Sequence, residues 1–219
     1  FALDQAVLLD RDSLRIVVES GTYVEDLLLG DGVSITGAVD SEVTIQGTIT
    51  GASGSSLRNL TLIPADGASH MVEMNDVAMF LLDVDFIGTP ARDVTAILVD
   101  GNVVPLNSAI DGCTFTSLGV GIDIGGEIPA IRRCTFGNIP AQFGDPATPG
   151  AGIIIRANSA LDTTVGTIGD QSDPENGWND FLDTIEGFAV INERDESLLM
   201  QSNYWGVGEE GEVPARISG

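Results

Sequence analysis

A six-residue pattern that recurs along the chain limits the fold more than any other feature. It reads apolar, any residue, polar, apolar, any residue, and then a large apolar or aromatic residue. The segments that carry it are 57–62, 81–86, 110–115 and 131–136, with a similar segment at 200–205. Their final positions advance by 24, 29 and 21 residues, and then by 69, which we interpret as about three further repeats.

A second set of short apolar runs lies between these segments. The runs are 72–74, 97–99, 122–124 and 153–155, and they advance by 25, 25 and 31 residues. Two interleaved columns of strands with such a repeat length indicate a solenoid, and the variable length favours a β-helix over a leucine-rich repeat. Because each coil rises about 4.8 Å, about eight coils would form a rod about 40 Å long.

Period-two alternation along each strand assigns side chains to faces. In the first column we expect Cys113, Cys134 and the aromatic positions to point inward, including Trp205. The residues expected to point outward in this column are Thr61, Asp85, Thr114 and Thr135, together with Tyr204. In the second column the outward residues are Glu73, Leu98, Asp123 and Ile154.

The two ends of the chain carry separate expectations. Residues 1–9 place apolar side chains at helical spacing, so we expect a short helix within 1–12 that caps the open N-terminal coil. We expect one domain over 1–219, with 200–219 forming the final coil and a tail. The chain begins at Phe1 without a signal peptide, and we interpret it as a processed piece of a longer polypeptide.

Three segments carry a resemblance to a known family. Residues 16–25 (IVVESGTYVE) and 32–37 (GVSITG) resemble the opening of right-handed parallel β-helix proteins of the pectin-lyase-like superfamily. Residues 110–124 resemble the generic repeat of that family, and 203–206 (NYWG) resemble an ending common in its non-catalytic members. The resemblance implies an all-β, right-handed parallel β-helix over nearly the whole chain. It leaves function open, because the superfamily includes lyases, hydrolases, esterases, epimerases, adhesins and phage fibres.

Charge and composition exclude several classes of function. The chain has 33 acidic residues and nine basic ones, all Arg, which gives a net charge of −24. Such a charge repels nucleic acids, anionic membranes and acidic polysaccharides, so we expect no nucleic-acid partner. The absence of Lys excludes a Schiff-base or P-loop lysine, and the single histidine, His70, excludes a multi-histidine metal site within this chain. No apolar run approaches the roughly 20 residues that span a bilayer.

The acidic residues also bear on where the protein works. An acidic surface whose only cations are arginines fits an extracellular or cell-surface protein, and it also fits a high-salt environment, where a well-hydrated surface keeps a protein in solution.

The acidic residues supply the candidate catalytic groups. Polysaccharide lyases of this superfamily use a basic residue beside a group that neutralises a carboxylate, and glycoside hydrolases use paired carboxylates. Adjacent coils could bring Asp85, Asp111, Asp123 and Arg132 together on the outer face, as a shallow cleft for a neutral glycan. The alternative is that these acidic residues only lie on the solvent side of strands.

Two further features each allow two interpretations. Residues 170–180 (DQSDPENGWND) concentrate oxygen ligands, so Asp170, Asp173 and Glu175 are calcium candidates, although their spacing is not that of an EF-hand. Alternatively, this segment is a turn-rich excursion from which Trp178 and Phe181 return to the core.

Cys113 and Cys134 stack on adjacent coils close enough for a disulfide, but we favour two reduced thiols that fill the core.

These observations favour a non-catalytic extracellular or cell-surface module that acts as a rigid structural or adhesive scaffold. Its partner would be a glycan or another surface protein, and we expect no cofactor other than calcium. One alternative is a carbohydrate-active enzyme or glycan-binding protein that uses the outer groove. Another is a component of a virion or filament.

Overall fold

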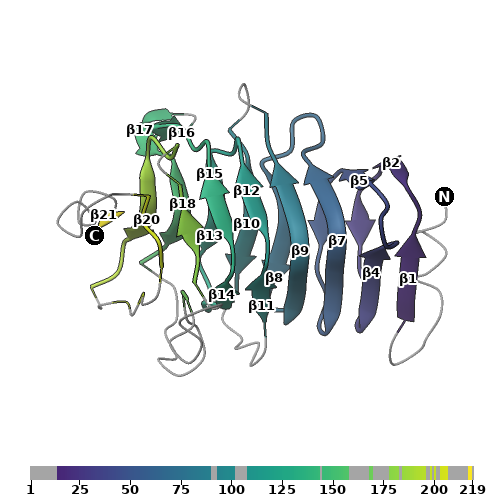
Figure 1. Ribbon diagram of the computed structural model, residues 1–219. Coiled ribbons are helices and arrows are strands. Elements are labelled where there is room, and N and C mark those ends of the chain that lie inside the picture. Colours follow the sequence, from purple (N-terminus) through teal and green to yellow (C-terminus); the bar gives the residue numbers. More distant parts are fainter. Residues whose placement is uncertain are drawn as a thin grey trace.

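The computed structural model describes residues 14–89, 93–101, 108–143, 145–157, 168–169, 178–182, 184–195, 198, 200, 203–206 and 217–218. These residues form strands and loops without a helix (Figure 1). Consequently, the described part of the chain holds no helix long and apolar enough to cross a membrane. The capping helix expected within 1–12 lies outside the described residues.

The strands are short, and most are two to six residues long. They are β1 Leu14–Val18, β2 Gly21–Val24, β3 Leu27–Leu28, β4 Val33–Gly37, β5 Val43–Gln46, β6 Ile49–Thr50, β7 Ser55–Ile63, β8 His70–Asn75, β9 Met79–Ile87, β10 Thr95–Asp100, β11 Ala109–Asp111, β12 Thr114–Thr116, β13 Val120–Ile124, β14 Ala130–Arg132, β15 Thr135–Gly137, β16 Gln142–Phe143, β17 Asp145–Pro149, β18 Ala151–Ile155, β19 Asp180–Phe181, β20 Phe188–Asn192 and β21 Ile217–Ser218.

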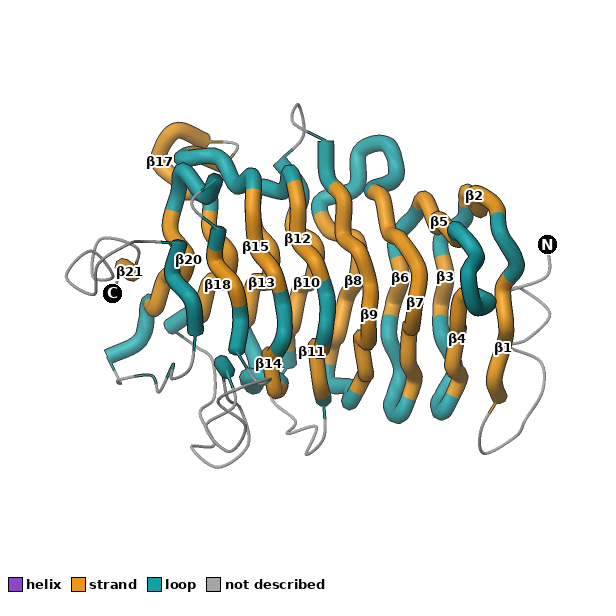
Figure 2. The backbone as a smooth tube through the Cα atoms, in the orientation of Figure 1, coloured by secondary structure: helices purple, strands orange, loops and turns teal. Residues whose placement is uncertain are grey.

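The strands form two parallel sheets whose strand order follows the chain. An eleven-stranded sheet runs β1-β4-β7-β9-β12-β15-β19, with β2, β5, β11 and β14 paired beside this path. An eight-stranded sheet runs β3-β6-β8-β10-β13-β18-β20-β21. The chain visits the two sheets alternately, and loops join them at both margins (Figure 2). The protein is therefore all-β with parallel strands, an arrangement compatible with a parallel β-helix. The pair β16 and β17 is antiparallel and separate from both sheets.

Strand pairing confirms the two columns expected from the sequence. Phe115 lies opposite Phe86 on one side and Phe136 on the other, and Ile122 lies between Ile97 and Ile153. Parallel pairing in register places like residues on top of one another, so every aromatic residue of the first column faces the same side of its sheet.

A stack of aromatic rings runs through the core. The rings of Phe86, Phe115, Phe136, Phe181 and Trp205 follow one another with centroids 4.6–5.0 Å apart and planes within 9° of parallel. The four phenylalanines are fully buried, and Trp205 packs against the core from a partly buried position. The spacing equals the distance between neighbouring strands, so the sheet itself holds the rings at contact distance.

The stack corrects one expectation about repeat number. The 69 residues between Phe136 and Trp205 are spanned by two ring-to-ring steps rather than three, with Phe181 between them. The reason is that the step from Phe136 to Phe181 takes 45 residues, whereas the other steps of the stack take 21 to 29.

The opposite sheet makes room for the rings with glycine. A Cβ atom added at Gly121 would lie 3.0 Å from the ring of Phe136 and 2.4 Å from the carbonyl oxygen of Gly152. A Cβ atom at Gly152 would lie 3.1 Å from the ring of Phe181. The absence of a side chain at these two positions therefore lets the sheets approach the aromatic stack.

A column of left-handed backbone conformations separates the two halves of the eleven-stranded sheet. Asn59, Asp83, Gly112 and Arg133 have φ values of 52°, 54°, 67° and 54° and occupy equivalent positions on successive strands. Asparagine, aspartate and glycine adopt this conformation readily, but it is unusual for arginine. The repeated turn fixes the direction of the side chains on either side of it.

The aromatic stack gives the first prediction. Phe136→Ala removes the middle ring and is expected to lower the free energy of unfolding by about 3–5 kcal/mol, because a fully buried ring is lost and a cavity remains. Urea denaturation followed by circular dichroism measures the change. Ile87→Ala, at a side chain that is 42% exposed, is the control and should cost about 1 kcal/mol or less. Equal losses in the two variants would contradict the central role of the stack.

Candidate functional site

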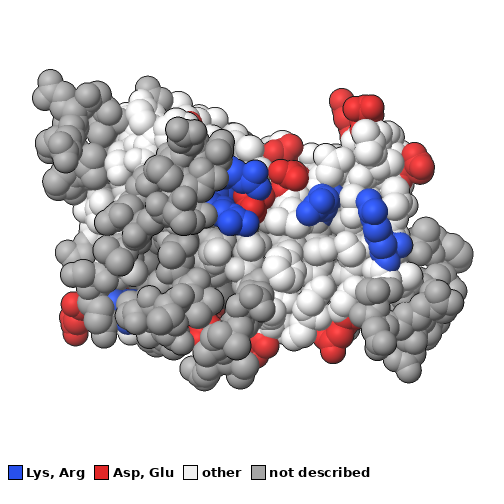
Figure 3. All heavy atoms as spheres, turned by 60° about the horizontal axis from the view of Figure 1, so that its bottom comes forward, with Lys and Arg blue, Asp and Glu red and all other residues white. Residues whose placement is uncertain are grey.

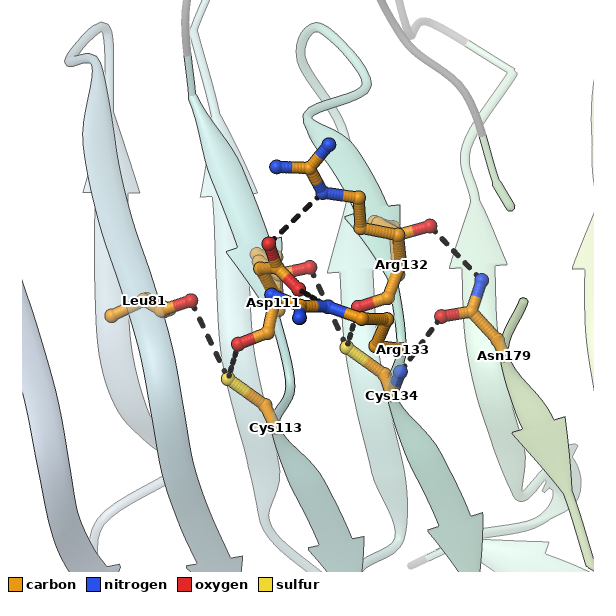
Figure 4. A network of polar contacts seen from close by, with 9 residues as sticks. Leu81, Asp111, Cys113, Arg132, Arg133, Cys134 and Asn179 are labelled. Carbon is orange, nitrogen blue, oxygen red and sulfur yellow. Dashed lines mark hydrogen bonds and ion pairs between the residues drawn. The ribbon is translucent and has the colours of Figure 1, made fainter. Parts of the chain in front are cut away.

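Asp111 lies at the end of β11 and is held by two arginines from the next strand. The Nε atom of Arg132 donates to Oδ2 at 2.9 Å, and the Nε atom of Arg133 donates to Oδ1 at 2.5 Å (Figure 4). The Asp111 side chain is only 4% exposed, whereas the two arginines are about half exposed. Parallel pairing places Arg132 directly opposite Asp111, and the left-handed turn at Arg133 lets the next side chain reach the same carboxylate.

Buried polar groups lie beneath this ion pair. The thiols of Cys113 and Cys134 are free, and each has two backbone carbonyl oxygens within 3.2–3.6 Å that can accept or share its single proton. Burial raises the pKa of the Cys113 thiol well above its ordinary value, so it stays protonated. Of the two interpretations allowed by the sequence, the structure therefore has the reduced thiols.

Asparagines continue the cysteine column toward the end of the sheet. Asn179 is fully buried, accepts a hydrogen bond from the backbone N–H of Cys134 and donates to the carbonyl oxygen of Ile131 (Figure 4). Its side chain also donates to the Oδ1 atom of Asn203, and Asn203 donates to the carbonyl oxygen of Ile168. These amides satisfy backbone groups that would otherwise be buried without partners.

Asp85 and Asp123 also have partners. The hydroxyl of Thr114 donates to Asp85 from the adjacent strand. Arg156, just after β18, binds Asp123 with two hydrogen bonds of 2.6 and 2.8 Å and reaches Glu193 at 3.0 Å. The hydrogen bonds that Arg156 donates to Asp123 raise the pKa of Arg156, so this guanidinium stays charged. Arg156 and Glu193 were not singled out in the sequence, although the register of Ile122 with Ile153 places Arg156 close to Asp123.

The structure brings some of the four candidate catalytic residues together and separates others. Asp111 and Arg132 are in contact, and Asp85 lies on β9 of the same eleven-stranded sheet. Asp123 lies on β13 of the eight-stranded sheet. The four residues therefore do not line a single cleft.

Arginines gather on the outer side of the eleven-stranded sheet. Figure 3 shows arginine and acidic atoms side by side near the middle of one face, with further arginine atoms toward one end. At the β1 end, Arg15 and Arg58 line a shallow groove of about 530 Å³. Asp40 and Asp83 line the same groove and offset the positive charge, so it offers little attraction to an anion.

The calcium candidates expected from the sequence are three acidic residues within 170–180. Asp170, Asp173 and Glu175 lie outside the described residues. Among the residues that the structure does describe, no group of three or more His, Cys, Asp or Glu side chains could hold a metal ion. His70 begins β8, contacts the hydroxyl of Ser69 at 3.1 Å and lies 3.9 Å from Glu73.

Trp178 departs from its expected position. It was expected to return to the core with Phe181, and Phe181 does so, but Trp178 is 53% exposed. Because Asn179 points into the core, strand alternation turns both Trp178 and Asp180 outward. Tyr204 pairs with Asp180 on the next strand and is 50% exposed, as its outward assignment predicted.

Asp180 differs from the other carboxylates in this part of the molecule. Its Oδ1 atom is buried without a hydrogen-bond partner, and burial raises the pKa of the carboxyl. Asp85, Asp111 and Asp123, in contrast, each accept a hydrogen bond from a neighbouring side chain.

No family model, curated protein or solved structure matches the chain. What the site can do must therefore follow from its own geometry. Both oxygens of Asp111 accept hydrogen bonds, one from each of two guanidinium groups. Both oxygens of Asp123 accept hydrogen bonds from a single guanidinium group. Carboxylates engaged in this way link strands and are poorly placed to exchange protons with a substrate.

The ion pair at Asp111 gives a second prediction. Asp111→Ala is expected to lower the free energy of unfolding by about 1–3 kcal/mol, because a buried acceptor of two charged hydrogen bonds is removed. Arg132→Ala should cost less, about 1 kcal/mol, since its side chain is 44% exposed. Urea denaturation of both variants compares them, and a larger loss for Arg132→Ala would contradict this ranking.

The unpartnered carboxyl gives a third prediction. Because the pKa of Asp180 is raised in the folded state above its ordinary value of 3.8, the folded protein binds this proton more tightly than the unfolded chain does. Ionised Asp180 therefore destabilises the fold, and the penalty grows as the pH rises above about 4.

Asp180→Asn should remove this penalty. The variant is expected to be more stable than the wild type at pH 7, and the difference should shrink as the pH falls toward 3.5. Urea denaturation across this range measures it. A wild type that is the more stable of the two at pH 7 would contradict the assigned environment.

Proposed function

We propose that this chain is a non-catalytic module that acts as a rigid structural or adhesive scaffold outside the cell or on its surface. Its fold would be a right-handed parallel β-helix of about eight coils, of the pectin-lyase-like type, with an N-terminal capping helix. The chain would form part of a longer polypeptide. Acidic residues spread over its surface would keep the module hydrated, including at high salt.

The uninterrupted aromatic stack carries this proposal. Five rings in contact tie successive strands of the eleven-stranded sheet into one column, and glycines of the opposite sheet lie against it. Each strand is in turn bonded to a strand on either side over most of both sheets. Such a column would join successive repeats into one continuous unit, which suits a spacer or a support for binding surfaces.

The state of the acidic residues also supports a role without catalysis. A retaining or inverting glycosidase needs two carboxyl groups facing one substrate position. Asp111 and Asp123 are engaged by arginines and lie on different sheets. Asp85, on the same sheet as Asp111, accepts a hydrogen bond from Thr114.

A polysaccharide panel tests the proposal and gives the fourth prediction. The protein is incubated with neutral and acidic polysaccharides, with and without calcium, and reducing ends and the absorbance of unsaturated products are followed. We expect no turnover from a sample shown to be folded by circular dichroism.

Two variants make the assay decisive. Asp123→Ala and Arg132→Ala would abolish turnover if either residue belonged to an active site. Turnover that disappears in these variants would overturn the scaffold proposal and establish an enzyme.

A further inference from the structure

Two large aromatic side chains face solvent where the rest of the aromatic column faces the core. Trp178 is 53% exposed and Tyr204 is 50% exposed, at the end of the eleven-stranded sheet where β19 lies. Asp180 pairs with Tyr204 across adjacent segments, and Trp178 lies two residues before Asp180. Strand geometry then places the Cα atoms of Trp178 and Tyr204 about 8 Å apart on one surface.

The interior at this level is already filled. Asn179 points inward and bonds to Ile131 and Asn203, while Phe181 and Trp205 stack on each other. Because Asn179, Phe181 and Trp205 point inward, strand alternation turns Trp178 and Tyr204 outward, which accounts for their exposure. A half-exposed tryptophan and a half-exposed tyrosine offer apolar surface to water, and a ligand that covers this surface gains its hydrophobic free energy.

Asp180 neighbours both aromatic residues, opposite Tyr204 and two residues from Trp178. Its Oδ1 atom is buried without a partner while the side chain as a whole is partly exposed, so a sugar hydroxyl would reach the outer part of the carboxylate. A buried polar atom without a partner is rare in folded proteins. The equivalent residue two strands away, Thr114, instead donates to Asp85.

The chemistry of these three residues matches an uncharged sugar. One face of a pyranose ring carries C–H groups, which are attracted to the electron-rich face of an aromatic ring. The hydroxyl groups at its edge donate hydrogen bonds to a carboxylate. The net charge of −24 disfavours a polyanionic glycan, and the nearest arginine pair, Arg132 and Arg133, is bound to Asp111.

We propose that Trp178, Asp180 and Tyr204 form a subsite that binds a neutral glycan. Sugar rings stack on the two aromatic side chains, and a sugar hydroxyl donates to Asp180. The subsite deepens the proposed adhesive role and rests on it, since it names the partner that a non-catalytic module would hold.

The experiment uses tryptophan fluorescence, because the chain has two tryptophans and only Trp178 is at the proposed subsite. Trp205→Phe keeps an aromatic ring on the stack and leaves Trp178 as the only tryptophan. This variant is titrated with neutral oligosaccharides (cello-, xylo-, manno- and malto-hexaose) and with oligogalacturonate. We expect one neutral series to shift the emission to shorter wavelength and to protect Trp178 from acrylamide quenching.

Calorimetry on the full chain assigns the residues. Trp178→Ala, Tyr204→Ala and Asp180→Ala are each expected to raise the Kd for that oligosaccharide about tenfold. Leu28→Ala, at a side chain that is 67% exposed on β3 at the other end of the molecule, is the matched control and should leave the Kd unchanged. Circular dichroism establishes that each variant is folded, and if Trp205→Phe does not fold, the difference between wild type and Trp178→Phe reports the same signal.

The binding results test the subsite, and the state of the recovered sugar tests the non-catalytic role. Failure of all neutral oligosaccharides to bind at millimolar concentration, tighter binding of oligogalacturonate, or unchanged affinity in the three variants would overturn the subsite. Chromatography of the bound oligosaccharide adds an independent reading. Recovery of intact sugar supports adhesion, whereas cleaved sugar would overturn the non-catalytic role even if the subsite is correct.

Discussion

The contact between one aromatic ring and the next is the interaction on which the rest of the structure depends. Rings 4.6–5.0 Å apart match the spacing of neighbouring strands, so stacking and backbone pairing reinforce each other. A shift of one residue in any strand would replace a ring with an outward residue such as Asp85 or Thr114. The stack therefore helps to fix the register of β9, β12, β15 and β19 and, through the register, the positions of the surface side chains on these strands.

The surface features follow from that register. Asp111 meets Arg132 because their strands pair in parallel, and the left-handed turn brings Arg133 to the same carboxylate. On the other sheet, Arg156 binds both Asp123 and Glu193 and so links three neighbouring strands. In both places an acidic residue links strands, which means that part of the large negative charge holds the fold together instead of serving chemistry.

Sequence patterns predicted the columns well, because spacing and alternation determine which residues stack. Phe86, Phe115 and Phe136 lie in the core as expected, and Trp205 packs against it from a partly buried position. Phe181 was placed in the core but not recognised as a member of the repeat, since both apolar positions before it are asparagines, Asn176 and Asn179, and 45 residues separate it from Phe136. Trp178 was assigned inward by its hydrophobicity, although alternation from Phe181 would have turned it outward.

Side-chain partners were harder to predict than columns. Arg156 is the partner of Asp123 because its side chain reaches back along the neighbouring strand. The composition of the sequence does not show how far a side chain reaches. Ile154 shows a related limit: it is buried in a small apolar cluster with Val120 and Ala151, separate from the main core. Alternation gave its direction, but burial on the outer side depends on contacts that a single strand cannot reveal.

Parallel pairing in chain order also has a consequence for how the molecule is made. No strand of either parallel sheet can find its partner through a tight hairpin, because the neighbour lies a whole repeat away. Closing such long loops is slow because the chain loses conformational entropy. The first two paired repeats therefore form the nucleus, and each later repeat pairs with the exposed edge strand of the repeats already folded. The existing ring and backbone groups then serve as a template, and assembly should proceed by growth along the axis from whichever repeats pair first.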